Sequence, residues 1–197
     1  MEYLVTMTTH VPEGTPDQAV ADIRSREAAR SRELAAQGRL LRLWRPPLQP
    51  GEWRTLGLFA AADDGRLEEV LASMPLRVWR TDEVTALSTH PNDPGLAAGA
   101  PGSEILTTFV IDVPEGTPDR AVEETEAREA ERAEELAAQG HLRRLWRLPG
   151  RGRSLGLWQA ASPAQLQAIL RSLPLDPWMT VQTTRLTLHP SDPAQAS

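Results

Sequence analysis

The chain contains no cysteine among its 197 residues. This absence excludes disulfides, thiolate nucleophiles and cysteine-ligated metal sites. Aromatic residues make up only 5 % of the chain, and no run of about 18 apolar residues occurs, which argues against a membrane span. The first residues carry no basic region followed by an apolar stretch, so we expect no signal peptide and a cytoplasmic protein.

Basic residues are also in the minority, with 21 Lys and Arg against 27 Asp and Glu, a net charge of −6. Such a chain is a poor general binder of phosphate backbones, so we expect neither nucleic acid nor a membrane as partner. The four histidines lie far apart and form no HxH or HExxH pair, so we expect no metal. No phosphate loop, nucleotide fingerprint or GxSxG elbow occurs, so we expect no cofactor, and the expected partner is a small-molecule substrate.

The most informative feature of the chain is an internal repeat. The heptapeptide Val-Pro-Glu-Gly-Thr-Pro-Asp occurs twice, and residues 11–45 match residues 113–147 at 24 of 35 positions. The spacing then shortens because the loop after Arg45 is three residues longer than the loop after Arg147. Because the match continues almost to the end of the chain, it indicates a tandem duplication.

The repeat and the composition between its copies predict the domain organisation. We expect a first repeat at 1–92, a Gly- and Pro-rich linker at 93–102, a second repeat at 103–192 and a tail at 193–197.

Each copy shows the order strand, helix, strand, strand, helix, strand. In the first copy the strands are expected at 4–9, 40–45, 55–60 and 79–87, with helices at 16–37 and 65–73. In the second they are expected at 105–112, 142–148, 154–160 and 178–188, with helices at 118–139 and 163–172. Thr15 and Thr117 are expected to cap the long helices, and Gly38 and Gly140 to end them.

This order predicts an α+β fold of two ferredoxin-like βαββαβ units, each with both helices on one face of an antiparallel sheet. The other face of each sheet needs a cover. We therefore expect the two units to pack sheet to sheet as an intramolecular pseudo-dimer of the dimeric α/β-barrel type.

A carboxylate on the apolar stripe of the long helix is the first candidate functional group. Glu27 lies seven residues from both Val20 and Leu34. Seven helical residues return to within about 20° of the starting direction, so Glu27 is expected to point toward the sheet. Glu129 repeats this arrangement in the second copy. A buried charge is costly unless paired or used. The alternative is a surface charge lattice with the neighbouring arginines.

The strand after that helix ends in a Trp-Arg pair in both copies, Trp44-Arg45 and Trp146-Arg147. Neighbouring side chains of a strand point to opposite faces. One member therefore faces the core and the other a cavity or solvent. The arginine is suited to hold a substrate carboxylate as a bidentate fork, the alternative being a core Trp and a surface Arg.

The last strand of each copy offers two further candidates. Trp79 and Trp178 are expected to begin that strand and to line either the core or the mouth of a pocket. His90 and His189, each followed by Pro, end the copies. The alternative for these histidines is a capped strand end with a solvated ring.

Together these residues resemble the muconolactone Δ-isomerase family. The resemblance is carried by Arg26-Glu27, Glu33-Leu34, Gln37-Gly38, Leu43-Trp44-Arg45, Met74-Pro75-Leu76 and His90-Pro91, and in the second copy by residues 173–179. The chain departs from the family at several positions. The family's Lys three residues before the Glu is Arg24 here and Glu126 in the second copy, and its Asn on the third strand is Thr55 or Ser154.

The resemblance implies a cofactor-free isomerase or cyclase that moves a proton on a small unsaturated lactone or related polyketide-like metabolite. Glu27 or Glu129 would be the general base and then the acid, and Arg45 or Arg147 would hold a carboxylate or enolate oxygen. The other residues expected at the substrate are Trp44, Trp146, Trp79, Trp178, Met179, His90, His189, Thr55 and Ser154. The alternatives are a non-catalytic small-molecule-binding protein and a halide-eliminating lactone lyase. The resemblance also implies a homo-oligomer of the two-repeat chain.

Overall fold

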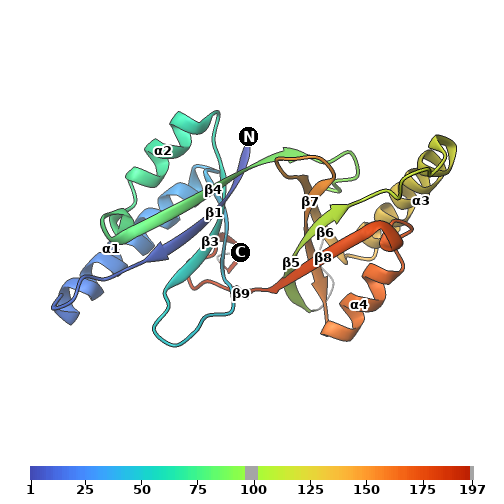
Figure 1. Cartoon of the computed structure of the whole chain (residues 1–197). Coiled ribbons are helices and arrows are strands. Elements are labelled where there is room, and N and C mark those ends of the chain that lie inside the picture. Colours follow the sequence, from blue (N-terminus) through green and yellow to red (C-terminus); the bar gives the residue numbers. More distant parts are fainter. Residues whose placement is uncertain (96–101, 196–197) are drawn as a thin grey trace. The chain divides into compact units, whose positions relative to one another are not determined.

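The computed structural model describes residues 1–95 and 102–195 (Figure 1). This part of the chain forms two compact units. The first contains Met1–Leu87 together with 187–195, and the second is Ser88–Leu186. Each unit therefore consists mainly of one repeat and includes the end of the other repeat. The expected linker lies largely outside the described residues, and the domain boundaries expected from the sequence stay a prediction.

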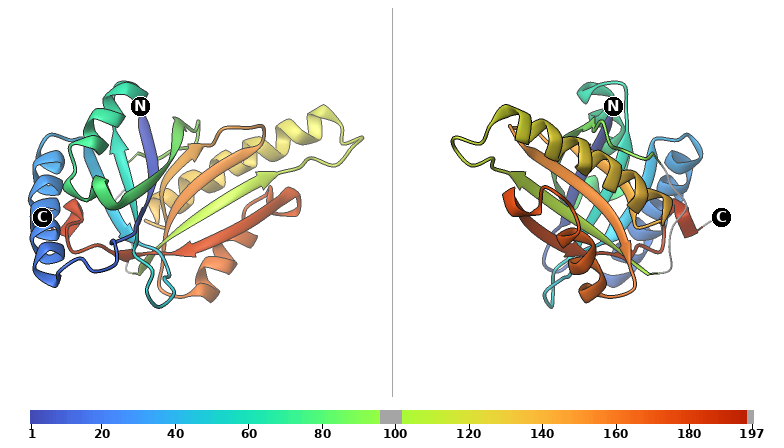
Figure 2. Two further views of the ribbon diagram at one scale, coloured as in Figure 1. Left: turned by 60° about the vertical axis from the view of Figure 1, so that its left-hand side comes forward. Right: turned by 90° about the vertical axis from the view of Figure 1, so that its right-hand side faces the viewer.

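The first unit contains a five-stranded antiparallel arrangement in the order β4-β1-β3-β2-β9. Its elements are β1 (Glu2–Thr9), α1 (Asp17–Ala36), β2 (Leu40–Arg45), β3 (Arg54–Ala60), α2 (Asp64–Ala72), a 3₁₀ turn (Pro75–Trp79), β4 (Arg80–Thr89) and β9 (Thr187–Leu188). Helices α1 and α2 lie on the same face of the sheet (Figure 2).

The second unit repeats this plan in the order β8-β5-β7-β6. Its elements are β5 (Ser103–Ile111), α3 (Asp119–Ala138), β6 (Leu142–Arg147), β7 (Arg153–Ala160), α4 (Pro163–Arg171), a 3₁₀ turn (Asp176–Trp178) and β8 (Met179–Arg185). Ser88 and Thr89, the last residues of β4, pair with β6. The prediction of two ferredoxin-like α+β repeats is thus confirmed, while their sheet-to-sheet packing stays a prediction.

The long helices end as the sequence predicts. Gly38 adopts φ +67° directly after the C-cap residue Gln37. The Gly38 N–H donates to the Ala35 carbonyl and the Arg39 N–H to the Leu34 carbonyl, both at 2.9 Å. These two bonds form a Schellman motif, which requires a left-handed residue that glycine adopts at little cost. Gly140 has φ +76° at the same place in the second unit.

The predicted threonine caps were wrong. Pro16 and Pro118 occupy the N-cap positions and provide no side-chain cap. The hydroxyls of Thr15 and Thr117 instead donate backward, each over 2.6 Å, to the carbonyls of Pro12 and Pro114. Each threonine lies one residue before the N-cap, and this bond turns its side chain toward the preceding turn instead of the first N–H groups of the helix.

The last strand of each copy starts later than predicted. Trp79 and Trp178 end the 3₁₀ turns, and β4 and β8 begin at the residues that follow them. Proline near the start of each turn favours the turn over an extended strand. The final predicted strand is also interrupted at Leu186, whose N–H donates to the Glu104 carbonyl. The chain then enters the first unit as β9, where Thr187 pairs with Arg45.

Each unit has its own apolar core between the sheet and its two helices. The first core includes Tyr3, Leu34 and Phe59, and the second includes Phe109, Leu136 and Trp158. Burial of these side chains supplies the main driving force that fixes the helices over the sheet. Within the described residues, no helix combines the length and apolar character needed to cross a bilayer.

Candidate active site

Each unit contains a cavity between its sheet and its long helix, and this cavity is partly open to solvent. The first cavity, of about 430 Å³, is lined by Met7, Thr9, Ala21, Arg24, Ser25, Glu27, Ala28, Ser31, Leu43, Arg45, Trp53, Thr55, Met74, Leu76, Arg80, His189, Pro190 and Ser191. The second, of about 280 Å³, is lined by His90, Pro91, Asn92, Phe109, Ile111, Glu126, Glu129, Ala133, Leu142, Leu145, Arg147, Ser154, Trp158, Leu173, Leu175 and Met179. Volumes of this size suit small molecules.

Glu27 is the central acid of the first cavity. Its side chain is only 12 % exposed. One carboxylate oxygen accepts the Leu76 N–H at 2.8 Å, and the other lies 3.2 Å from the Arg80 guanidinium. Burial raises the pKa of Glu27 above its usual value and Asp82 adds to this, whereas the Leu76 hydrogen bond and Arg80 lower it. A buried, oriented carboxyl with a raised pKa is suited to general acid–base chemistry.

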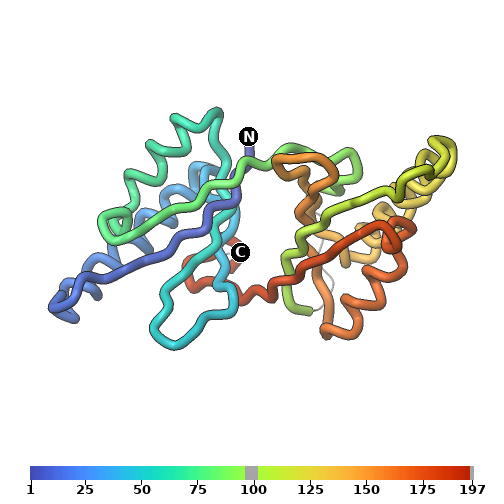
Figure 3. Tube along the Cα trace, viewed as in Figure 1, coloured from blue at the N-terminus to red at the C-terminus, as the bar shows by residue number. Residues whose placement is uncertain are grey.

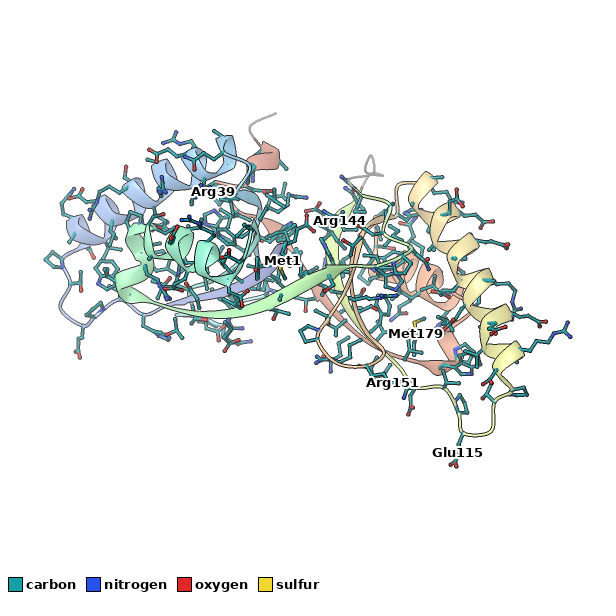
Figure 4. All side chains as sticks on the ribbon, turned by 90° about the horizontal axis from the view of Figure 1, so that it is seen from above. Met1, Arg39, Glu115, Arg144, Arg151 and Met179 are labelled. Carbon is teal, nitrogen blue, oxygen red and sulfur yellow. The ribbon has the colours of Figure 1, made fainter. Side chains whose placement is uncertain are left out.

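Glu129 is the corresponding acid of the second cavity. It accepts the Leu175 N–H at 3.0 Å. Met179 occupies the position equivalent to Arg80, so the arginine that contacts Glu27 is replaced by a thioether. Burial raises the pKa of Glu129 and Asp176 adds to this, while the Leu175 hydrogen bond opposes it. Met179 packs against the core of the second unit (Figure 4).

A histidine from the other repeat completes each cavity. His189 lines the first cavity and His90 the second. Figure 3 traces the C-terminal segment into the first unit. Burial lowers the pKa of His189 to about 4, and Arg45 and Arg24 contribute, whereas Asp192 opposes them. Burial and Arg147 likewise lower the pKa of His90.

The hydrogen bonds of these rings identify their donor nitrogen. Nδ1 of His189 accepts the Ser191 N–H, and Nδ1 of His90 accepts the Asn92 N–H, both at 3.1 Å. A neutral ring that accepts at Nδ1 carries its proton on Nε2. Both histidines are therefore neutral donors through Nε2.

An aspartate three residues after each histidine anchors the segment that ends each repeat, which we call its tail (residues 88–93 and 187–192). Asp192 accepts the Leu43 N–H at 3.0 Å, and Asp93 accepts the Leu145 N–H at 2.8 Å. Each aspartate also forms an ion pair with an arginine of the strand that it contacts. Asp192 pairs with Arg42 of β2, and Asp93 pairs with Arg144 of β6. These contacts hold the two tails against β2 and β6 and thereby position the histidines.

The structure gathers most of the predicted site residues. Glu27, Arg45, Thr55 and His189 line the first cavity. Glu129, Arg147, Ser154, His90 and Met179 line the second. The two-copy arrangement places equivalent residues in equivalent cavities, except that each histidine comes from the other repeat.

The predicted tryptophans are not among the lining residues. Trp44 and Trp146 are buried, and the guanidinium groups of Arg42 and Arg144 lie 4.9 and 4.7 Å from their ring centroids. They match the alternative interpretation, in which the Trp of the Trp-Arg pair belongs to the core. Trp79 and Trp178 are half-buried where the 3₁₀ turns end.

Several lining residues were missed in the sequence. Arg80 was not singled out because it appeared to be an ordinary strand residue after Trp79. Comparison of the two copies does show that Met179 replaces it in the second copy. Trp53 lies in the loop where the copies differ in length, and Arg24 stacks over its ring at 5.4 Å. No local sequence signal predicted that the end of each repeat joins the unit of the other repeat, because this depends on contacts between residues that lie far apart in the sequence.

The two cavities differ in charge. The first is lined by Arg24, Arg45 and Arg80 and by the single carboxyl of Glu27, and Arg80 is also paired with Asp82 at 2.6 Å. The second contains Arg147 with the carboxylates of Glu126 and Glu129. The first cavity thus favours an anion and the second does not.

Comparison with known sequences places this geometry in context. The muconolactone delta-isomerase family is matched at residues 1–93 and 104–192. The Muconolactone Delta-isomerase of Acinetobacter baylyi is 32 % identical over 92 residues, covering 47 % of this chain and 93 % of that protein. That of Cupriavidus pinatubonensis is 30 % identical over 92 residues, covering 47 % of this chain and 97 % of that protein.

Comparison with solved structures concerns the fold alone. A chlorite dismutase from Candidatus Nitrospira defluvii aligns with a TM-score of 0.64 and 10 % identity, covering 96 % of this chain and 92 % of that one. A heme-binding protein from Thermus thermophilus aligns with a TM-score of 0.62 and 12 % identity, covering 100 % of this chain and 95 % of that one. At these identities the likeness supports the dimeric α/β-barrel type of fold and nothing about ligands.

Proposed function

The chain belongs to the muconolactone delta-isomerase family, and from this premise we propose that the first cavity is a cofactor-free isomerase site for a small unsaturated lactone carboxylate. The observation that carries the proposal is the position of Glu27, a largely buried carboxyl that is paired with Arg80 in a cavity also lined by Arg24 and Arg45. Shifting the double bond of a small lactone carboxylate needs a base that removes a proton from carbon and a cationic group that holds the carboxylate. The second cavity has the acid but offers a single arginine.

Glu27 is the proposed base. Its carboxylate removes a proton from the carbon at one end of the allylic system, breaking a C–H bond and forming an O–H bond. The electron pair is delocalised into the lactone as a dienolate. Glu27 then returns the proton at the other end of the allylic system, so the double bond shifts and no net oxidation occurs. The hydrogen bond from Leu76 N–H keeps one carboxylate oxygen oriented throughout.

Arg45 and His189 are the proposed partners of the two anionic groups. Arg45 lines the cavity from the end of β2 and would hold the substrate carboxylate, for which a guanidinium fork is well matched. His189 would donate its Nε2 proton to the developing dienolate oxygen. A neutral imidazole is suited to this role because its pKa is already far below neutral.

Separate Glu27→Gln and Glu129→Gln variants test the proposal. Isomerisation of muconolactone would be followed together with incorporation of deuterium from solvent, which reports proton transfer directly. We expect Glu27→Gln to lower kcat by about 10²- to 10⁴-fold, the usual contribution of a general base. Glu129→Gln should change it less than about threefold.

Glu33→Gln is the matched control, because Glu33 lies on the same helix with its side chain 61 % exposed. Unchanged turnover in Glu27→Gln would remove the proposed base. Chloride release from a chlorinated lactone at a higher rate than isomerisation would instead identify a halide-eliminating lyase. Absence of turnover in the unmodified chain, together with a ligand affinity that both Glu→Gln variants retain, would identify a binding protein.

A further inference from the structure

The second cavity retains the fold of the first but has a different chemical character. Several equivalent lining positions carry different residues in the two cavities, and five of them change the size, polarity or charge of the lining. In the second cavity Arg80 becomes Met179, Thr9 becomes Ile111, Ser31 becomes Ala133, Arg24 becomes Glu126 and Met7 becomes Phe109. Three of these changes replace a polar side chain with an apolar one, a fourth reverses a charge, and the fifth replaces a thioether with an aromatic ring.

The second cavity also has an aromatic wall, formed by Phe109 and Trp158, that the first cavity lacks among its lining residues. Phe109 and Trp158 pack edge to face with their ring centroids 6.2 Å apart. The Trp158 Nε1–H donates to the Thr107 hydroxyl at 2.8 Å, so the polar edge of the indole is already satisfied. The indole therefore offers the cavity an apolar surface.

The remaining charges disfavour an anion. Glu126 and Glu129 both line the second cavity, against the single guanidinium of Arg147. An anionic ligand there would meet more negative than positive charge, and like charges close together repel each other. An apolar ring would instead gain from contact with Phe109, Trp158 and Met179.

We propose that the second cavity is a separate binding site for a neutral, largely apolar ring compound that carries no carboxylate. The cavity of about 280 Å³ limits this ligand to a single small ring with short substituents. The Glu129 carboxyl and the His90 ring are the polar groups that orient it. This inference concerns the cavity that the proposed isomerase activity does not use, so it is tested by binding and independently of turnover.

The chain contains a reporter for each cavity. Trp53 lines the first cavity and Trp158 the second, among six tryptophans. Indole ¹⁵N–H resonances of the labelled chain, with the Trp53 signal assigned through Trp53→Phe and the Trp158 signal through Trp158→Phe, distinguish the two sites. Benzoate and methyl benzoate are suitable unreactive probes because they share one ring and differ in the negative charge.

We expect methyl benzoate to shift the Trp158 resonance saturably and with at least tenfold higher affinity than benzoate. Benzoate should shift the Trp53 resonance. Equal affinity of the two probes at Trp158 would overturn the proposal. A Trp158 resonance that does not move at any methyl benzoate concentration up to its solubility limit would also overturn it. Binding of benzylamine at Trp158 at least tenfold tighter than that of methyl benzoate would overturn it as well, because it would identify a cation site.

Variants that copy the first repeat into the second sharpen the test. Glu126→Arg restores the charge found at Arg24, at a position exposed enough to tolerate it. We expect it to raise benzoate affinity at Trp158 about tenfold or more while changing methyl benzoate affinity less than threefold. Met179→Arg should act in the same direction at the position of Arg80. No gain of benzoate binding in the folded Glu126→Arg chain would contradict the assignment by charge.

Discussion

Asp192 and Arg42 form a buried ion pair in the first unit although they are 150 residues apart in the sequence. The Arg42 Nη2 lies 3.1 Å from the Asp192 carboxylate, and the Asp192 side chain is fully buried. The same carboxylate accepts the Leu43 N–H. This aspartate therefore fixes the tail that brings His189 into the first cavity.

Asp192→Asn should loosen that tail. The substitution leaves the buried Arg42 without its carboxylate, and breaking a buried pair typically lowers the free energy of unfolding by about 3–5 kcal/mol. Because His189 is held by this tail, kcat/KM should fall as well. Urea unfolding and initial rates on the same preparation measure both effects.

Asp93→Asn is the matched change in the second unit. Asp93 is paired with Arg144 in the same way, so stability should fall by a similar amount. Turnover should fall much less than in Asp192→Asn, since Asp93 positions His90 in the other cavity. Equal losses of turnover in both variants would mean that the tails affect activity through stability alone.

The partly buried Glu27 and Glu129 should lower the free energy of unfolding at neutral pH. A carboxyl whose pKa is raised by folding favours the folded state below its unfolded pKa, and that contribution disappears as pH rises through the folded pKa. Glu129 has this raised pKa and no arginine at the position of Arg80. Glu129→Gln should therefore raise the free energy of unfolding at pH 7, by about 0.5–2 kcal/mol.

Glu27→Gln should give a smaller gain, because glutamine forfeits the ion pair with Arg80. The comparison is made by urea unfolding at pH 7 and again at pH 4. At pH 4 the advantage of Glu129→Gln should shrink, since the wild-type carboxyl is then largely protonated. An advantage that is unchanged at pH 4 would rule out ionisation as its cause.

His189 should titrate far below an ordinary histidine. Its pKa is lowered to about 4 by burial and by Arg45. The unfolded chain binds a proton near pH 6.5, whereas the folded chain does not, so stability should fall as pH drops from about 6.5 to about 4. NMR titration of the His189 ring measures this directly, and a midpoint near 6.5 would contradict the buried placement. His189→Gln should remove this part of the pH dependence.

Much of the fold was predictable because the repeat supplied two independent copies of each local signal. Glycine at 38 and 140 ended both long helices as expected, since a left-handed C-terminal residue is a local requirement. The inward direction of Glu27 followed from helical periodicity alone. The capping prediction at Thr15 failed because the competing acceptor, the Pro12 carbonyl, lies in the same turn.

The remainder of the site depended on contacts that a local pattern does not contain. His189 appeared to end the second repeat, yet it lines the cavity of the first unit. The Asp192 that holds it was invisible as a partner of Arg42, because nothing within either segment specifies the other. Repeats predict which residues are equivalent, but they do not tell which unit a terminal segment joins.

Gly156 is expected to be intolerant of a side chain. A Cβ at this position would overlap the Trp158 indole nitrogen and lie 2.9 Å from the Thr107 hydroxyl oxygen, the two partners of one buried hydrogen bond. Moving either group away from the added methyl group would strain that bond. Gly156→Ala should therefore lower the free energy of unfolding by about 1–3 kcal/mol, the usual cost of overpacking.

Gly57→Ala is the equivalent change in the first unit and should cost less. Its Cβ would overlap the Phe59 ring and lie 3.0 Å from the terminal methyl of Met7, a flexible side chain that opens onto the first cavity. Urea unfolding compares the two variants. Gly156→Ala should also weaken methyl benzoate binding, because Trp158 and Phe109 form the wall of that cavity. A Gly156→Ala chain with unchanged stability and unchanged probe affinity would show that the indole is free to shift, and its bond to Thr107 would then not fix the wall.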